Sequence, residues 1–264
     1  MTTINDFNGK WALVTGASAG IGVALARELA AHGAKLILTA RRRERLESVA
    51  AELTGKGTEV RIVTADLNDP TAAQQIFDAT EGAGLTVDIL INNAGLGLYG
   101  AFTQSDLAQE LGQVRVNCES MVRLTRLFVP RMVERRRGWV MILASTASFQ
   151  PVPYLSTYAA TKAFDRVFAL GIAAEVARFG VKVTALCPGP TESEFFDVAH
   201  ASVFKGRGIQ SAEDVARLGV HALARGQRTI IPYFAGRFTA LLVRLLPVGL
   251  ITYFIEKSAR PKNF

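Results

Sequence analysis

Residues 11–22 read WALVTGASAGIG, and this stretch decides the fold of the chain. The apolar run Trp11–Val14 predicts a buried strand, and VALARELAAHG (residues 23–33) predicts an alanine-rich helix. Glycines stand between them at positions 16, 20 and 22. They let the backbone turn tightly and approach a pyrophosphate at the positive end of the helix. The G-x3-G-x-G spacing therefore predicts a dinucleotide site, although a turn that merely needs small residues is the alternative.

Apolar strand candidates alternate with helical patterns along the rest of the chain. We expect strands at Lys35–Ala40, Glu59–Thr64, Val87–Asn92, Trp139–Ala144, Val181–Cys187 and Arg228–Pro232. We expect helices at Arg43–Leu53, Thr71–Glu81, Asp106–Met132, Thr157–Phe179 and Ala212–Ala224. This alternation is typical of a parallel sheet covered on both faces, and it predicts a Rossmann-like, doubly wound α/β fold of about seven strands. The expected division is one dinucleotide-binding and catalytic domain, residues 1–235, with a helical C-terminal extension, residues 236–264.

The charge distribution argues against a nucleic-acid partner. The net charge is +7, but the last 29 residues carry five basic side chains and one acidic one, and so supply +4 of it. The run Arg135–Arg137 before Gly138 is typical of a helix C-terminus, where cations meet the negative end of the helix dipole. We expect no nucleic acid to bind.

Cysteine, histidine and the N-terminus indicate a cytoplasmic protein without a metal. Cys118 and Cys187 lie far apart in apolar contexts, so we expect buried, reduced thiols. Met1–Lys10 is polar and does not predict a secretory signal. The three histidines, at positions 32, 200 and 221, form no ligand-like pattern with cysteines or carboxylates, and no metal site is expected.

Tyr158 and Lys162 lie four residues apart in STYAATKAF (156–164), and Ser145 lies thirteen residues before Tyr158. On a helix, positions i and i+4 share a face. An ammonium beside a phenol stabilises the phenolate, so we expect the pKa of Tyr158 to lie below its ordinary value of about 10. Such a group can transfer a proton near neutral pH, as carbonyl reduction requires. The spacing alone also fits a solvated helix face.

Two polar motifs follow expected strands directly. Ser145 comes after Trp139–Ala144, and Asn92-Asn93-Ala94-Gly95 overlaps the end of another strand. Ligands of doubly wound sheets bind beyond the carboxyl ends of the strands. We therefore expect both motifs at the same edge as the glycine turn.

Together these motifs resemble the short-chain dehydrogenase/reductase family over essentially the whole chain. The shared motifs are TGxxxGIG at 15–22, Asp66, NNAG at 92–95, Asn117, Ser145, Tyr158-x3-Lys162 and Pro188-Gly189. The resemblance implies nicotinamide-dependent hydride transfer to or from a carbonyl carbon. TARRRERLE (39–47) and the long apolar tail are most similar to the general bacterial reductase subgroup of that family.

The resemblance also implies roles for individual residues. Tyr158 would donate a proton to the carbonyl oxygen, Ser145 would orient that oxygen, and Lys162 would lower the pKa of Tyr158 and hold the nicotinamide ribose. Asn117 would hold a water that links Lys162 to solvent. The implied cofactor contacts are Gly16, Ser18, Gly20, Ile21, Gly22, Arg41, Asp66, Asn93, Ala94, Gly95, Tyr158, Lys162, Pro188, Gly189, Thr191 and Ser193.

The residues after the second strand indicate NADP(H). An acidic residue there would bind the ribose 2′-hydroxyl of NAD, but Ala40 is followed by three arginines. Guanidinium groups match phosphate oxygens in a bidentate geometry. The resemblance indicates Arg41 as the main contact to the 2′-phosphate and Arg42 as a second, although Ala19 stands where some NADP-using relatives carry another basic residue.

The substrate is less well defined by the sequence. Side chains that could either wall an apolar pocket or pack in the core are Phe149, Val152, Tyr154, Phe195, Phe196 and Phe204. We expect a hydrophobic small-molecule carbonyl or secondary alcohol as substrate and a homodimer or homotetramer as assembly. The alternatives are a 3-oxoacyl thioester reductase and, in another class, a non-catalytic NADP-sensing scaffold.

The C-terminal segment Leu241–Ile255 is apolar with few interruptions. It is shorter than the roughly 20 residues of a membrane span, and Pro247 divides it into two expected helices. These helices could pack over the substrate cleft or a subunit interface, or lie on a membrane periphery as an amphipathic anchor for anionic lipid. Apolarity on nearly all sides after Pro247 favours packing.

Overall fold

The computed structural model describes residues 4–199, 201, 209–243 and 245–261. Seven parallel strands form a single sheet in the order β3-β2-β1-β4-β5-β6-β7. Their bounds are β1 Trp11–Thr15, β2 Lys35–Ala40, β3 Val60–Thr64, β4 Val87–Asn92, β5 Gly138–Leu143, β6 Val181–Leu186 and β7 Thr229–Ile230. The strand order reverses between β1 and β4, which is where doubly wound sheets place a ligand. The predicted fold class is confirmed.

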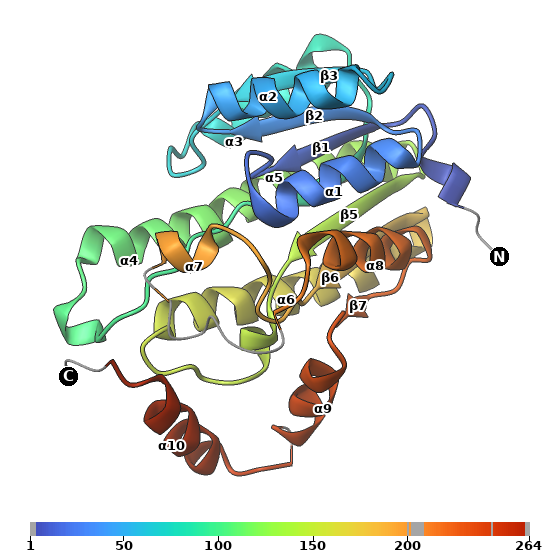
Figure 1. Cartoon of the computed structure of the whole chain (residues 1–264). Helices are drawn as coiled ribbons and strands as arrows, with labels where there is room; N and C mark the ends of the chain where they lie inside the picture. Colours follow the sequence, from blue (N-terminus) through green and yellow to red (C-terminus); the bar gives the residue numbers. More distant parts are fainter. Residues whose placement is uncertain (1–3, 200, 202–208, 244, 262–264) are drawn as a thin grey trace.

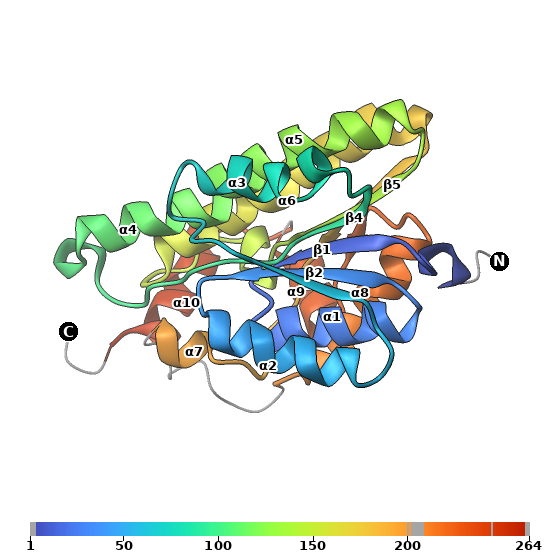
Figure 2. The ribbon, with the colours of Figure 1, turned by 90° about the horizontal axis from the view of Figure 1, so that it is seen from above.

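Helices cover both faces of the sheet, as the view from above shows (Figure 2). One face carries α1 (Gly20–Ala31), α2 (Arg43–Thr54) and α8 (Ala212–Ala224). The other carries α3 (Ala72–Asp78), α4 (Leu107–Val114), α5 (Ser120–Glu134) and α6 (Ser156–Val176). Because both faces are covered, the strands are apolar on both sides, which explains their continuous hydrophobic runs.

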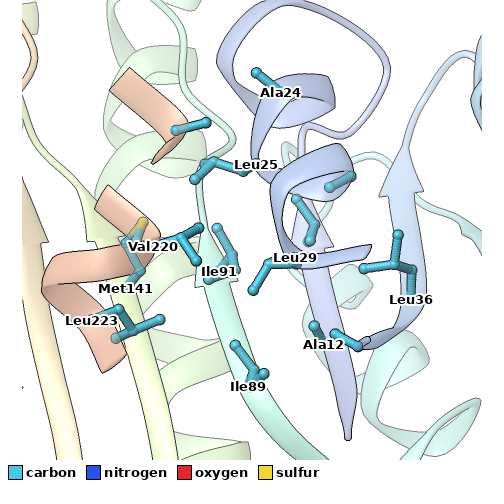
Figure 3. Packing of buried hydrophobic residues seen from close by; sticks show 14 of the residues in the cluster. Ala12, Ala24, Leu25, Leu29, Leu36, Ile89, Ile91, Met141, Val220 and Leu223 are labelled. Carbon is cyan, nitrogen blue, oxygen red and sulfur yellow. The ribbon is translucent and has the colours of Figure 1, made fainter. Parts of the chain in front are cut away.

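The core between α1, α8 and the sheet is closely packed (Figure 3). Leu25 and Leu29 of α1 belong to one cluster with Ile89 and Ile91 of the sheet and Val220 of α8, and all five are fully buried. Burying a side chain of this size contributes about 1.5–3 kcal/mol. This packing fixes the N-terminus of α1, and with it the glycine turn, against the end of β1.

The single helix predicted for Asp106–Met132 consists of three parts. Asp106 caps α4 by accepting a hydrogen bond from the amide of Ala108 at 3.0 Å. A π-helical turn, Arg115–Glu119, then joins α4 to α5. Turns of this kind occur frequently at functional sites. The hydrophobic period does not change enough at the turn to reveal it in the sequence.

Two short helices follow β7 and project from the body of the molecule (Figure 1). They are α9 (Phe234–Leu242) and α10 (Val248–Ala259), with Pro247 at the N-cap of α10. The two expected helices are thereby present, and α9 starts slightly before the expected domain boundary at residue 236. Within the described ranges, no helix combines the length and apolar character that crossing a bilayer requires.

Candidate active site

The turn between β1 and α1 accepts only glycine at its tight points. Gly16 and Gly20 adopt positive φ angles of 65° and 52°. A Cβ atom at Gly22 would lie 2.2 Å from the carbonyl oxygen of Gly16, so no side chain fits there. The N-cap of α1, Ala19, provides no side-chain cap. The first amides of α1 therefore face the cavity with the positive end of the helix dipole, as an anion site requires.

Thr15, which the sequence analysis did not single out as a cofactor or catalytic residue, ties this turn to the neighbouring strand end. Its hydroxyl donates to the carbonyl of Ile91 and accepts from the amides of Asn93 and Ala94 at 2.9 and 3.0 Å. The side chain of Asn93 returns a hydrogen bond of 2.8 Å to the carbonyl of Thr15. The threonine of the TG pair thus sets the spacing between two walls of the cavity.

A cavity of about 570 Å³, here termed the main cavity, lies beyond the carboxyl ends of the strands. It is lined by every expected cofactor residue, among them Tyr158 and Lys162, and by one further expected catalytic residue, Ser145. These residues are Gly16, Ser18, Gly20, Ile21, Gly22, Arg41, Asp66, Asn93, Ala94, Gly95, Ser145, Tyr158, Lys162, Pro188, Gly189, Thr191 and Ser193. The expected catalytic residue that lies outside this lining is Asn117.

The arginines after β2 occupy different environments. Arg41 is exposed, lines the cavity, and makes no hydrogen bond or ion pair with any described residue. Arg42 instead donates to Glu194 at 2.9 Å and to Ser18 at 3.3 Å. Glu194 also pairs with Arg45, and these arginines hold the pKa of its carboxyl below its usual value. Arg41 is consequently the guanidinium with free donors at this wall.

Tyr158 and Lys162 project from α6 toward the end of β5, where Ser145 stands. Ser145 occupies the position that follows β5, and its hydroxyl accepts from the amide of Ala147 at 3.1 Å. The ammonium of Lys162 donates to the carbonyl of Leu143 at 2.7 Å and lies 6.0 Å from the centre of the Tyr158 ring. The phenol, hydroxyl and ammonium thus lie along one wall of the cavity.

Asp165, one turn further along α6, is the second buried charge of the site. Its Oδ2 lies 2.9 Å from Nζ of Lys162, and both side chains are almost completely buried. Burial alone would lower the pKa of Lys162, but the negative charge of Asp165 raises it overall. Burial raises the pKa of Asp165, against the opposing effect of Lys162. The charged form of Lys162 is therefore stabilised by Asp165.

The pKa of Tyr158 differs from the sequence-based expectation. Burial raises it above the ordinary value, while the charge of Lys162 and a hydrogen bond with Ser145 act in the lowering direction. The expected contribution of Lys162 is present, but the net direction that we expected is wrong. The i,i+4 spacing gives the position of the ammonium and contains no information on how little water reaches the phenol.

Asn117 lies behind this wall, in the π-helical turn. Its amide accepts from the amide of Leu96 at 2.7 Å and donates to Leu96 carbonyl and Thr161 Oγ1 at 2.9 and 2.8 Å. It lines a second, small cavity of about 10 Å³ together with Asp165 and Asn92. A cavity of this size and polarity holds about one water molecule. Through its two hydrogen bonds to the backbone of Leu96, the side chain of Asn117 fixes the loop that carries Gly95.

The remaining part of the main cavity is largely apolar. Of the expected wall residues, Val152, Phe195 and Phe196 line it, while Phe149 and Tyr154 line a neighbouring pocket. Phe204 lies outside the described residues. Ile255 and Ser258 of α10 complete the lining. Two hydrogen bonds of 2.7 Å hold this helix: Tyr99 donates to the carbonyl of Ala259, and Tyr154 donates to the carboxylate of Glu256. The expectation that the tail covers the cleft is supported for this face of α10.

Two further expectations concern groups outside the cavity. Cys118 and Cys187 are free and buried, and burial raises the pKa of both thiols to about 12.

The expectation that the histidines form no cluster is wrong for two of them. His32, at the C-cap of α1, and His221 of α8 approach Glu28, with ligand atoms within 4.8 Å of one another. His200 lies outside the described residues.

Comparison with known proteins gives concordant matches. The profile described as short chain dehydrogenase matches residues 10–202. A very-long-chain 3-oxoacyl-CoA reductase of Anas platyrhynchos is 36% identical over 187 residues, 68% of this chain and 59% of that protein. The match thus spans less than two thirds of that relative's length.

Solved structures agree over a larger part of the chain. A short-chain dehydrogenase from Sphingobium yanoikuyae in complex with NADPH has a TM-score of 0.82 at 29% identity, covering 92% of this chain and 95% of that one. A short chain dehydrogenase/reductase from Burkholderia phymatum in complex with NAD has the same TM-score at 26% identity, covering 89% and 93%.

Proposed function

The chain belongs to the short-chain dehydrogenase family, and on that premise we propose that it is an NADPH-dependent oxidoreductase acting on a carbonyl group or secondary alcohol. The observation that carries this proposal is the convergence of Ser145, Tyr158 and Lys162 on the cavity that also contains the glycine turn. Every position that the reaction needs is filled, which disfavours a non-catalytic scaffold. The filled motifs also support placement with the general bacterial reductases.

In the proposed reduction, the chain's own residues donate the proton and replace it. A bound nicotinamide supplies the hydride. Tyr158 donates its proton to the carbonyl oxygen, and the hydroxyl of Ser145 holds that oxygen in place. The ammonium of Lys162 stabilises the phenolate that remains, and Asp165 keeps Lys162 charged. Asn117 and the small cavity beside Asp165 provide room for a water that returns a proton toward Lys162. In the oxidative direction the same groups act in reverse.

The site fits a dinucleotide phosphate. Gly16, Gly20 and Gly22 leave the space that a pyrophosphate needs, and α1 presents amides without a side-chain cap. Arg41 has free donors for a 2′-phosphate, and no acidic residue stands directly after β2. We therefore assign NADP(H) as the preferred cofactor, with Arg41 as the main contact. Arg42 is a second contact that would have to leave Glu194.

The substrate in this proposal is a hydrophobic small molecule. Val152, Leu155, Phe195 and Phe196 give the part of the cavity beyond Tyr158 an apolar surface. A 3-oxoacyl thioester is the second candidate, favoured by the similarity to the very-long-chain 3-oxoacyl-CoA reductase of Anas platyrhynchos together with this apolar surface.

We also propose a cytoplasmic homo-oligomer. Leu107, Leu111 and Val114 of α4 and Phe164 and Val167 of α6 are exposed, and the two helices are in contact. This shared apolar surface suits a self-complementary interface between two copies. Residues 236–264, as the C-terminal extension of one domain, remain available for another contact.

NADPH consumption by the full chain against a panel tests the proposal. The panel contains hydrophobic ketones, hydrophobic aldehydes and 3-oxoacyl thioesters. Turnover of at least one class, lost in Ser145→Ala, is expected. Preference for the thioesters over ketones of equal chain length would select the second candidate. Tight NADPH binding without turnover of any class would favour the scaffold.

A further inference from the structure

The C-terminal helices leave an apolar surface uncovered. Among the described residues, sixteen large hydrophobic side chains are exposed, and nine of them lie between Phe234 and Phe254. Monomeric proteins rarely leave so concentrated an apolar patch in contact with water. The sequence favoured packing over the substrate cleft or a subunit interface, and within the single chain the outward faces of these helices are left uncovered.

The outward face of α9 follows a helical period. Phe234, Phe238 and Leu241 are spaced by four and three residues, and 82% of Phe234 is exposed. Leu245, which lies beyond the end of the helix at Leu242, is 76% exposed. The opposite face packs inward through the buried Gly236 and Ala240. The large side chains thus point away from the protein, and the small ones toward it.

The α10 helix is divided in the same way. Ile251 and Ala259 are buried, while Leu250, Tyr253 and Phe254 are exposed. Lys257 lies on the outward face, three residues after Phe254. An apolar face that contains tyrosine and lysine is typical of helices at the boundary between lipid headgroups and acyl chains.

The charges of this surface have one sign. Arg237 and Lys257 are exposed beside the apolar residues, and Arg260 follows at the end of α10. Glu256, the single acidic residue of the segment, accepts from Tyr154 at 2.7 Å and pairs with Arg260. Its charge is therefore held on the side that faces the protein body.

We propose that the outward faces of α9 and α10 dock the protein on an anionic lipid bilayer. The apolar side chains enter the headgroup boundary, and Arg237 and Lys257 contact anionic headgroups. A second copy fits this surface less well, because the same patch on both subunits would bring two sets of cations and, among the described residues, no free acidic side chains into one interface. The apolar surface of α4 and α6 provides self-association elsewhere.

Docking there brings the main cavity close to lipid. Ile255 and Ser258 line that cavity from the inward side of α10, the helix whose outward face carries Tyr253 and Phe254. If the proposed function holds, a hydrophobic carbonyl substrate dissolved in the bilayer lies beside the cavity. This consequence rests on the proposed function, whereas the docking itself does not.

Vesicle flotation of the full chain tests the docking. We expect co-flotation with vesicles of phosphatidylcholine and phosphatidylglycerol in equal parts, and much less with phosphatidylcholine alone or at high salt. Phe238→Ser with Phe254→Ser should abolish flotation, and Lys257→Glu should reduce it several-fold. The matched controls are Phe102→Ser, another exposed phenylalanine, and Lys56→Glu, the same charge change at an exposed lysine just after α2. Both controls should float like wild type.

The outcomes separate the alternatives. Wild type that stays at the bottom of the gradient with both kinds of vesicle, or a double variant that floats like wild type, would overturn the proposal. A double variant with unchanged melting temperature that instead reduces the oligomer mass would assign the surface to a second copy. NADPH consumption is measured separately, so a failure of docking and a failure of the proposed activity are distinguishable.

Discussion

The ammonium of Lys162 lies 2.9 Å from Oδ2 of Asp165, one turn further along α6, and water reaches neither side chain to any extent. A buried ion pair of this kind gains little stability on balance, but removal of one partner leaves an isolated buried charge. Its position beside Tyr158 gives it a second consequence. The charge state of Lys162 and the proton affinity of Tyr158 both depend on Asp165.

Asp165→Asn tests this dependence through the pH profile. In the native protein the charge of Asp165 raises the pKa of Lys162, so Lys162 stays charged well above neutral pH. In the variant the lowering effect of burial dominates, and Lys162 loses its charge at lower pH. We expect the alkaline limb of kcat/KM to move to lower pH. An unchanged alkaline limb would show that Asp165 has no influence on the reaction.

The same pair makes a stability prediction. Asp165→Leu should lower the free energy of unfolding by about 3–5 kcal/mol, because it leaves the buried ammonium of Lys162 without a partner. Adding Lys162→Met in the same chain should recover most of the loss of melting temperature while activity stays absent. In the native protein, the stability that the charged Lys162 contributes beside Asp165 should persist through the neutral pH range. It should be lost as pH rises through the raised pKa of Lys162. A double variant as unstable as the single one would contradict the assignment.

Gly22→Ala tests the geometry of the dinucleotide turn. The added Cβ would meet the carbonyl oxygen of Gly16 at 2.2 Å, so we expect loss of NADPH binding and a lower melting temperature. Gly171→Ala on α6 is the matched control, since its Cβ would have no neighbour within 4 Å. That change should stabilise the protein by about 0.5–1 kcal/mol, as alanine does in an exposed helix. Normal NADPH affinity in Gly22→Ala would rule out the proposed binding mode.

Arg41→Ala tests the choice of cofactor. The loss of a charged hydrogen bond should weaken NADPH by about 1.5–3 kcal/mol and leave NADH nearly unchanged. Arg43→Ala is the control, because Arg43 is exposed nearby and pairs with Glu47. Fluorescence titration of both cofactors against the three proteins measures the effect. Equal losses for NADPH and NADH would exclude a contact between Arg41 and the 2′-phosphate.

The sequence predicted the sheet well because its inner strands are buried on both sides. Runs such as Val87–Asn92 are almost continuously apolar. The glycine turn after Trp11–Thr15 identifies the edge of the sheet at which a ligand binds. The site motifs follow these strands directly, so their convergence could be inferred from topology. The cofactor and catalytic positions other than Asn117 accordingly line one cavity.

What the sequence did not predict depends on long-range packing. Asp165 stands three residues after Lys162, so helix spacing alone could pair the two charges, but the sequence does not show that the pair is buried. His32 and His221 meet because α1 and α8 pack together, although they are distant in the chain. The outward face of α10 is apolar like its inward face, so composition alone cannot tell which one is covered.

The most direct test of the central claim is Tyr158→Phe, measured for both NADPH affinity and turnover of a carbonyl substrate found in the panel. The change removes the transferable proton and keeps the ring, which packs 5.0 Å from the ring of Phe195. We predict a dissociation constant for NADPH close to that of wild type and turnover reduced to background. Retention of most of the wild-type rate would contradict the assignment of Tyr158 as proton donor, and with it the proposed mechanism.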